Sequence, residues 1–312
     1  MHRIRIASFS LLFLATLGAC HPENPPGPGG SGAPAARISF EEIDPLLKAR
    51  DPEPAKEKLE ALLAKHGPDS GIAYRLSRVY RVLGDTSRAV EIVRKCLDAH
   101  PDSGRVWMEL GDIYSGLEVA TYLEKSRDAY LKARENGISD KELALPLGSV
   151  YGRLGQPDAA DAEFARARAA GAEEKVVLYN MALVRFVKKD WVKARELLEQ
   201  AIAKDPAYAE AKRELARVLL QGNPTDPATV SKAMNLVWEV KDALAEDWNL
   251  YEIMGDGWML ASDWDAAVDA YTNALKFGHN PKQVEDKYRE AALRQRAARK
   301  AQAAAQGSPP SK

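Results

Sequence analysis

The sequence predicts an all-α solenoid, a stack of helix–turn–helix repeats in which each repeat covers its neighbour. The first observation behind this prediction is a row of small residues whose successive spacings are 34, 37, 34, 34, 39 and 34 residues. The second is helical chemistry between them, with apolar residues three and four positions apart and Asp-rich turns. Such a stack works by presenting a surface, so we expect a binding protein and not an enzyme. The small residues are Ala55, Ala89, Ser126, Ala160, Ala194, Ala233 and Ala267.

Composition and motifs narrow the classes of partner. The 312 residues carry 44 Lys and Arg against 45 Asp and Glu, a net charge of −1. Nucleic-acid-binding proteins usually carry a clear basic excess, so we expect no nucleic-acid partner. The two cysteines form no disulfide framework or zinc motif, and the sequence has no phosphate-binding loop, HExxH or GxSxG motif. We therefore expect no catalytic residues, cofactor, metal or small-molecule substrate.

The first 19 residues predict a signal peptide. A short basic start that includes Arg3 and Arg5 precedes an apolar stretch from Ile6 to Leu17, which is too short to span a bilayer comfortably. The stretch ends in Leu17-Gly18-Ala19-Cys20. This ending resembles the bacterial lipobox, in which cleavage leaves an acylated cysteine as the first mature residue. We expect lipidation at Cys20, with an ordinary signal peptide as the alternative.

Residues 20–37 are rich in Pro and Gly and predict a flexible tether that reaches roughly 20–25 Å. The second residue of the expected mature chain is His21. By resemblance to enteric lipoproteins, the lack of Asp there favours the outer membrane. We expect a lipid-anchored protein of the cell envelope that faces the periplasm, and exposure at the cell surface remains an alternative.

The repeats resemble the tetratricopeptide repeat (TPR) family. That family has a bulky residue at position 4, Leu at 7, small residues at 8, 20 and 27, an aromatic at 11, a bulky residue at 24 and often Pro at 32. The second repeat follows this pattern with Leu76, Ser77, Tyr80, Gly84, Ala89, Val93, Cys96 and Pro101. The resemblance covers about residues 70–280 and implies a right-handed solenoid over residues 38–280. Its six to seven repeats lie near 39–69, 70–103, 104–140, 141–174, 175–208, 209–247 and 248–281.

The ends and interruptions of the array also have expected structures. Residues 39–42 form a capping-box pattern, and Pro45 indicates that the helix there is short or kinked. Insertions near 115–119 and 221–227 fall in turns, and Pro146 either lies inside a helix or begins it late. We expect a polar capping helix over residues 282–306, followed by a disordered tail over 307–312.

The resemblance implies that the first helix of each repeat lines a concave groove, with positions 5, 9 and 12 facing a bound segment. The protein-binding residues expected there are Tyr74, Arg78, Arg81, Met108, Asp112, Leu145, Tyr179, Leu183, Phe186, Arg213, Arg217, Asp256 and Met259. Tyr179, Leu183 and Phe186 would suit an apolar anchor, unless neighbouring repeats bury them. The chaperone-type clamp for a C-terminal carboxylate is not supported, because Leu145 and Ser149 occupy places that it needs.

These expectations combine into a membrane-anchored scaffold that binds peptide or helical segments of envelope proteins. By analogy, it resembles TPR lipoproteins that assist assembly of envelope machines, such as the pilotins of type IV pilus secretins. The alternative is an adaptor that docks peptidoglycan enzymes.

Overall fold

The computed structural model describes residues 38–48, 52–117, 119–222, 226–278 and 282–307, and none of these residues forms a strand. The chain divides at Ser139 and Asp140 into two compact units, which are described one at a time. The expected signal peptide, Cys20 and the tether lie outside the described residues, as does nearly all of the expected tail. No helix in the described part is both long and apolar enough to cross a membrane.

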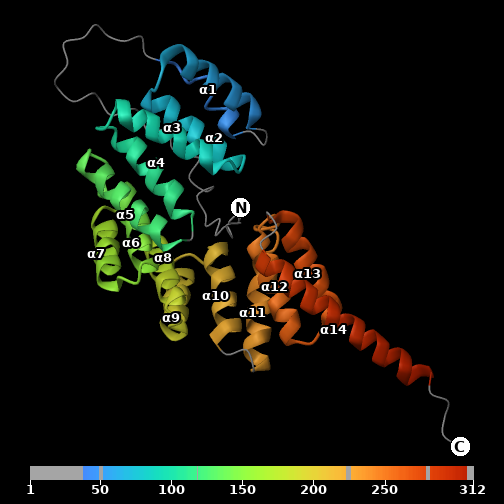
Figure 1. Cartoon of the computed structure of the whole chain (residues 1–312). Coiled ribbons are helices and arrows are strands. Elements are labelled where there is room, and N and C mark those ends of the chain that lie inside the picture. Colours follow the sequence, from blue (N-terminus) through green and yellow to red (C-terminus); the bar gives the residue numbers. More distant parts are fainter. Residues whose placement is uncertain (1–37, 49–51, 118, 223–225, 279–281, 308–312) are drawn as a thin grey trace, which may run out of the picture. The chain divides into compact units, whose positions relative to one another are not determined.

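The N-terminal unit begins with a short 3-10 helix, η2, and continues as five α-helices (Figure 1). Their bounds are η2 Leu46–Lys48, α1 Glu53–His66, α2 Ser70–Val82, α3 Thr86–Ala99, α4 Gly104–Ser115 and α5 Ala120–Glu135.

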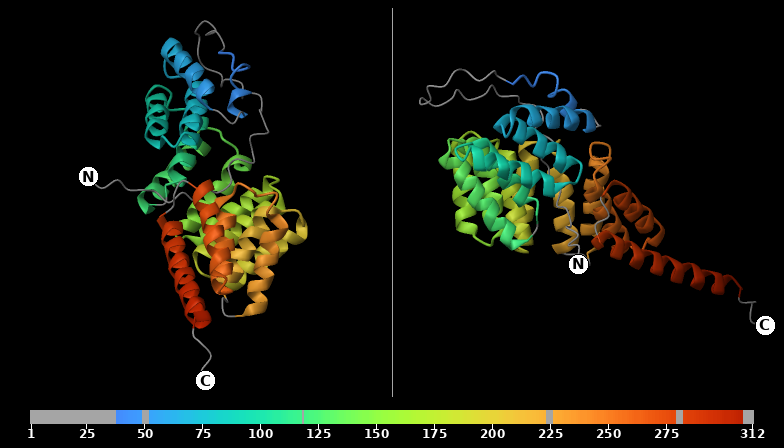
Figure 2. Two further views of the ribbon diagram at one scale, coloured as in Figure 1. Left: turned by 90° about the vertical axis from the view of Figure 1, so that its right-hand side faces the viewer. Right: turned by 45° about the horizontal axis from the view of Figure 1, so that its top comes forward.

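The C-terminal unit contains the remaining nine helices of the described residues (Figure 1). Their bounds are α6 Asp140–Arg153, α7 Pro157–Ala169, α8 Glu174–Val187, α9 Trp191–Lys204, α10 Ala209–Gly222, α11 Pro227–Val240, α12 Trp248–Leu260, α13 Trp264–Phe277 and α14 Lys282–Gly307. In the right-hand view of Figure 2, α14 continues well beyond the end of α13, and every side chain described from Arg296 to Ala304 is exposed.

Successive helices pair as hairpins, and this pairing confirms the predicted fold class. The hairpins are α2–α3 and α4–α5 in the N-terminal unit, and α6–α7, α8–α9, α10–α11 and α12–α13 in the C-terminal unit. The first helices of neighbouring hairpins also touch, because α2 contacts α4, α6 contacts α8 and α10 contacts α12. Each unit is therefore a stack of helix–turn–helix repeats.

The predicted small residues make this close packing possible. Ala89, Ala160, Ala194 and Ala267 are fully buried. Gly111 shows how tight the contact is, because a Cβ atom added there would lie 2.6 Å from the ring of Tyr130 on the paired helix. Side chains of ordinary size at these places would force the two helices apart.

A common turn joins the two helices in four of the hairpins. The residue before the N-cap has a positive φ, which lies between 59° and 77° at Gly84, Gly155, Lys189 and Ser262. The next residue is an aspartate in three of these turns. Asp85, Asp190 and Asp263 each accept a hydrogen bond from the backbone N–H three residues later, which satisfies a free donor of the second helix.

The structure corrects the expected helix start at residues 39–42 and decides where Pro146 lies. Residues 41–45 form turns that lead into η2, so the capping-box pattern at 39–42 does not start an α-helix. Phe40 and Ile43 instead bury their side chains in the core of the N-terminal unit. Pro146 lies inside α6 as the seventh residue of that helix, which begins at Asp140. Helix α4 ends at Ser115 and α10 ends at Gly222, where the sequence predicts inserted residues.

Candidate protein-binding surface

The predicted surface consists of positions 5, 9 and 12 of each first helix, counted from the repeat starts at residues 70, 104, 141, 175, 209 and 248. In the N-terminal unit these positions lie on α2 and α4, which contact each other. Tyr74, Arg78, Arg81 and Met108 are all partly exposed. The first three rise from one face of α2, because they are spaced four and three residues apart.

Tyr74 and Arg78 form a local pair on this face. The Arg78 guanidinium donates a 2.8 Å hydrogen bond to the Tyr74 hydroxyl and lies 5.3 Å from the centre of its ring. The guanidinium of Arg105, at the start of α4, lies 5.8 Å from the same ring. Two cations therefore lie near one aromatic ring, an arrangement that cation–π attraction favours.

Arg81 is paired with a carboxylate that the sequence analysis did not single out. Its guanidinium lies 3.1 Å from an oxygen of Glu109, whose side chain is only 1% exposed. Burial raises the pKa of the Glu109 carboxyl to about 7, against the opposing effect of Arg81. Asp112 accepts a 2.6 Å hydrogen bond from Tyr130, and burial raises its pKa as well.

In the C-terminal unit, two predicted surface residues are buried in an ion network. Arg213 is 3% exposed and Arg217 is 8% exposed. Arg213 lies 2.8 Å from Glu214 and also contacts Asp247. Arg217 lies 3.1 Å from Glu214 and 3.2 Å from Glu252 of α12. These contacts satisfy both arginines within the chain, so neither is available to a partner in this conformation.

The network extends into α14 through Lys287. Its ammonium lies 2.9 Å from Glu252 and 2.7 Å from Asp256, which in turn accepts a 2.7 Å hydrogen bond from Tyr271. Burial alone would raise the pKa of Glu252, but Arg217 and Lys287 hold it below its usual value. The predicted capping helix therefore neutralises the acidic end of the predicted groove with its own side chain.

The predicted apolar anchor site is only partly at the surface. Tyr179 is 4% exposed, and its ring packs 5.4 Å from that of Tyr208. Phe186 remains half-buried, edge-on to Trp191 at 5.3 Å, and Leu183 is half-buried. Burial by neighbouring elements, which the sequence left open as an alternative, therefore holds for Tyr179.

The remaining predicted positions have mixed environments. Leu145 is half-buried and packs against the core between α6, α7 and α8, and Met259 is half-buried on α12. The prediction missed Glu109 and Glu214, which both occupy position 6 and are buried. The signal for them is an arginine of opposite charge at a nearby repeat position, since Glu109 accepts from Arg81 at position 12 of the preceding repeat and Glu214 accepts from Arg217 at position 9 of its own repeat.

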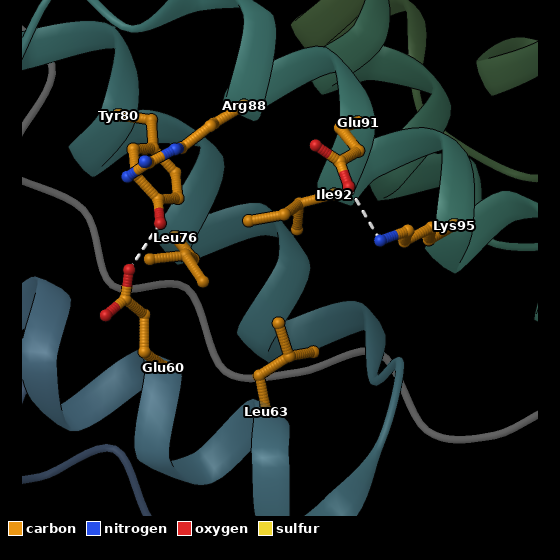
Figure 3. A pocket seen from close by; sticks show the side chains of 8 residues that line it. All are labelled: Glu60, Leu63, Leu76, Tyr80, Arg88, Glu91, Ile92 and Lys95. Carbon is orange, nitrogen blue, oxygen red and sulfur yellow. Dashed lines mark hydrogen bonds and ion pairs between the residues drawn. The ribbon is translucent and has the colours of Figure 1, made fainter.

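A pocket in the N-terminal unit lies away from these positions, where α1 and α3 flank α2 (Figure 3). Its volume is 310 Å³, and a second pocket of 440 Å³ shares Leu63, Ile92 and Lys95 with it. Most polar groups at the rim pair with one another: Tyr80 donates to Glu60, and Lys95 lies 2.6 Å from Glu91. The described residues contain no group of three or more His, Cys, Asp or Glu side chains that could hold a metal ion.

Family comparison agrees with the geometry of the hairpins. Residues 71–113 and 188–229 each match a tetratricopeptide repeat model, so the chain contains tetratricopeptide repeats in both units. A search of curated proteins found no match.

Solved structures show the same fold. A tetratricopeptide repeat protein from Parabacteroides merdae is similar with a TM-score of 0.66 and 15% identity, over 81% of this chain and 97% of that one. Yeast Tom70 is similar with a TM-score of 0.57 and 14% identity, over 84% of this chain and 62% of that one. PilW, described as a widely conserved type IV pilus biogenesis factor, is similar with a TM-score of 0.51 and 18% identity, over 69% of this chain and 97% of that one.

Proposed function

We propose that this protein is a non-enzymatic scaffold of the bacterial cell envelope, anchored in the membrane through an acylated Cys20. It binds a peptide or helical segment of a partner protein on the first helices of its repeats. The observation that carries the proposal is the face of α2 and α4, where Tyr74, Arg78 and Met108 remain partly exposed. An aromatic ring, a cation and an apolar side chain on adjacent helices are the residue types that anchor protein segments.

The process that we propose is assembly of an envelope complex, with the outer membrane as the site of anchoring. The lipobox-like ending at Cys20 supports the anchor. The similar fold of PilW, a type IV pilus biogenesis factor, supports the choice of process. A membrane anchor raises the local concentration of the scaffold near other envelope proteins, so even a weak surface becomes well occupied.

Photo-crosslinking in cells tests the binding surface. A photoreactive phenylalanine analogue replaces Met108 on α4, and in a control it replaces Arg195, an exposed residue on the second helix α9. We expect a covalent adduct with a partner protein from position 108 and none from position 195. Equal adducts from both positions, or none from either, would contradict a site on the first helices. The identity of the captured protein also distinguishes the two proposed roles, because it shows whether the partner is an assembly component or a peptidoglycan enzyme.

Mass spectrometry of the mature N-terminus tests the anchor. We expect Cys20 to be the first residue and to carry acyl chains, and Cys20→Ala to move the protein out of the washed membrane fraction. Stable anchoring requires more than one acyl chain, because a single chain binds reversibly. A mature chain that begins elsewhere, or one that is not acylated, would remove the anchor from the proposal and leave the binding surface untouched.

A further inference from the structure

Arg78 and Arg217 occupy the same position, 9, in the repeats that begin at residues 70 and 209. In the C-terminal unit, three acceptors surround Arg217. Glu214 lies on its own helix at position 6, at 3.1 Å. Glu252 and Asn249 lie on the next first helix at positions 5 and 2, both at 3.2 Å. Three acceptors fix the planar guanidinium, whose five N–H groups all need partners when buried.

The N-terminal unit has none of these three acceptors around Arg78. Position 6 of its own helix is Arg75, which pairs with Asp44 at 2.9 Å. On the next first helix, position 5 is Met108 and position 2 is Arg105. Each acceptor has thus been replaced by a cation or an apolar side chain, on two helices that contact each other as α10 and α12 do.

The carboxylates that do lie on this face feel the charge of Arg78, which partly offsets the rise in their pKa that burial causes, but they make their short contacts with other residues. Glu109 pairs with Arg81, and Asp112 accepts from Tyr130. No carboxylate of the described residues lies within ion-pair distance of Arg78, which donates its hydrogen bond to the Tyr74 hydroxyl. Arg78 is half-buried, and an ion pair there is screened less than at an open surface.

We propose that an acidic side chain of a partner segment binds beside Arg78, in the place that Glu252 occupies beside Arg217. The partner is therefore an acidic stretch of polypeptide, with an Asp or Glu carboxylate bound by the Arg78 guanidinium and attracted by the adjacent Arg105. Arginine suits this role because its planar fork can bind both carboxylate oxygens at once. The inference rests on the proposed function and gives the chemistry of the segment that the scaffold binds.

Fluorescence anisotropy tests the inference with the full chain in neutral detergent micelles. The probe is a fluorescein-labelled hexaglutamate with an amidated C-terminus, and the comparison probe is the matching hexaglutamine. We expect hexaglutamate to bind, hexaglutamine to bind at least about tenfold more weakly, and the affinity for hexaglutamate to fall as salt rises. Equal binding of the two probes would overturn the inference, since charge would then have no role.

Two matched substitutions at Met108 test whether a carboxylate supplied by the chain itself can occupy the site. Met108→Glu restores the carboxylate found at Glu252, so we expect it to pair with Arg78 and weaken hexaglutamate binding about tenfold. Met108→Gln has nearly the same shape as Met108→Glu without the charge, so it is the reference for that variant, and we expect it to bind hexaglutamate about tenfold more tightly than Met108→Glu does. Equal affinities for the two variants would overturn the inference, provided circular dichroism shows both folded.

Substitutions of Arg78 supply the complementary test. We expect Arg78→Ala to weaken binding about tenfold and Arg78→Lys to weaken it less, because lysine keeps the charge and loses the fork. Unchanged affinity in Arg78→Ala would overturn the inference. Binding that requires a free peptide C-terminus would also overturn the inference, because the site would then recognise a terminal carboxylate. If Met108 captures a partner in cells while no acidic probe binds, the scaffold stands and this inference fails.

Discussion

The Tyr130 hydroxyl donates a 2.6 Å hydrogen bond to the Asp112 carboxylate, and the two residues come from the paired helices α5 and α4. The same bond recurs at 2.7 Å between Tyr271 and Asp256 on α13 and α12. Each aspartate follows a glycine, Gly111 or Gly255, against which the tyrosine ring packs. A Gly-Asp step on the first helix and a Tyr on the second thus fix the same hairpin geometry in two repeats.

Loss of this hydroxyl should cost stability. In Tyr130→Phe the half-buried Asp112 carboxylate loses its donor, so we expect the free energy of unfolding to fall by about 2 kcal/mol. Urea denaturation followed by circular dichroism measures the change. Tyr122→Phe is the control, because Tyr122 is half-buried and stacks on Tyr114 without a hydroxyl bond in the described part of the chain. Equal effects of the two substitutions would show that the Asp112 bond contributes nothing.

Gly111, the residue before Asp112, should not accept a larger side chain without a loss of stability. Ala normally favours a helix over Gly by up to about 1 kcal/mol. In Gly111→Ala, however, the new Cβ lies 2.6 Å from the Tyr130 ring, and we expect a net loss of about 1–3 kcal/mol. Gly116→Ala serves as the contrast, because its Cβ comes no nearer than 3.5 Å to any atom and its φ is −73°. Thermal unfolding should place the midpoint of Gly111→Ala below that of Gly116→Ala, and the reverse order would refute the steric argument.

Glu109 should make the stability of the fold depend on pH. Because burial raises its folded pKa to about 7, above the ordinary value of 4.5, the folded chain binds this proton more tightly than the unfolded chain does. Its contribution is therefore favourable at low pH and is lost between about pH 4.5 and 7, on the order of 3 kcal/mol. Comparing urea midpoints of the wild type and Glu109→Gln across this range isolates the effect. We expect a steeper fall in the wild type, and parallel curves would contradict the assignment.

The fold could be predicted because its determinants are local and repeated. Small residues such as Ala89 and Ala267 must recur wherever paired helices approach closely, so their spacing alone gives the repeat length. Turn aspartates such as Asp85 mark the start of second helices for the same local reason. The region around Phe40 was harder to predict, because burial of its side chain in the core, and not the capping pattern, decides the conformation there.

The surface was only partly predictable, because exposure depends on residues distant in the sequence. Arg78 and Arg217 occupy the same repeat position, yet one is half-exposed and the other is buried. The difference comes from the residue 30 or 35 positions later, Met108 in one case and Glu252 in the other, and from Lys287 of α14. A repeat pattern fixes which positions face each other and leaves open whether their charges are complementary.

The network around Arg217 yields the last prediction. In Arg217→Met, Glu214 and Glu252 stay buried without this cation, so we expect a loss of about 3–5 kcal/mol in the free energy of unfolding. Replacing Glu252 as well, in Arg217→Met/Glu252→Met, removes one of the two carboxylates that have lost Arg217 and should recover part of that loss, which a double-mutant cycle measures.

The exposed pair Arg195–Glu199 on α9 provides the matched comparison, since its side chains are 51% and 40% exposed. Arg195→Met should change the free energy of unfolding by less than about 1 kcal/mol, because water screens such a pair and solvates whichever partner remains. Urea denaturation of both variants at low and high salt completes the test. If Arg217→Met were no more destabilising than Arg195→Met, the buried network could not be what holds α10 against α12.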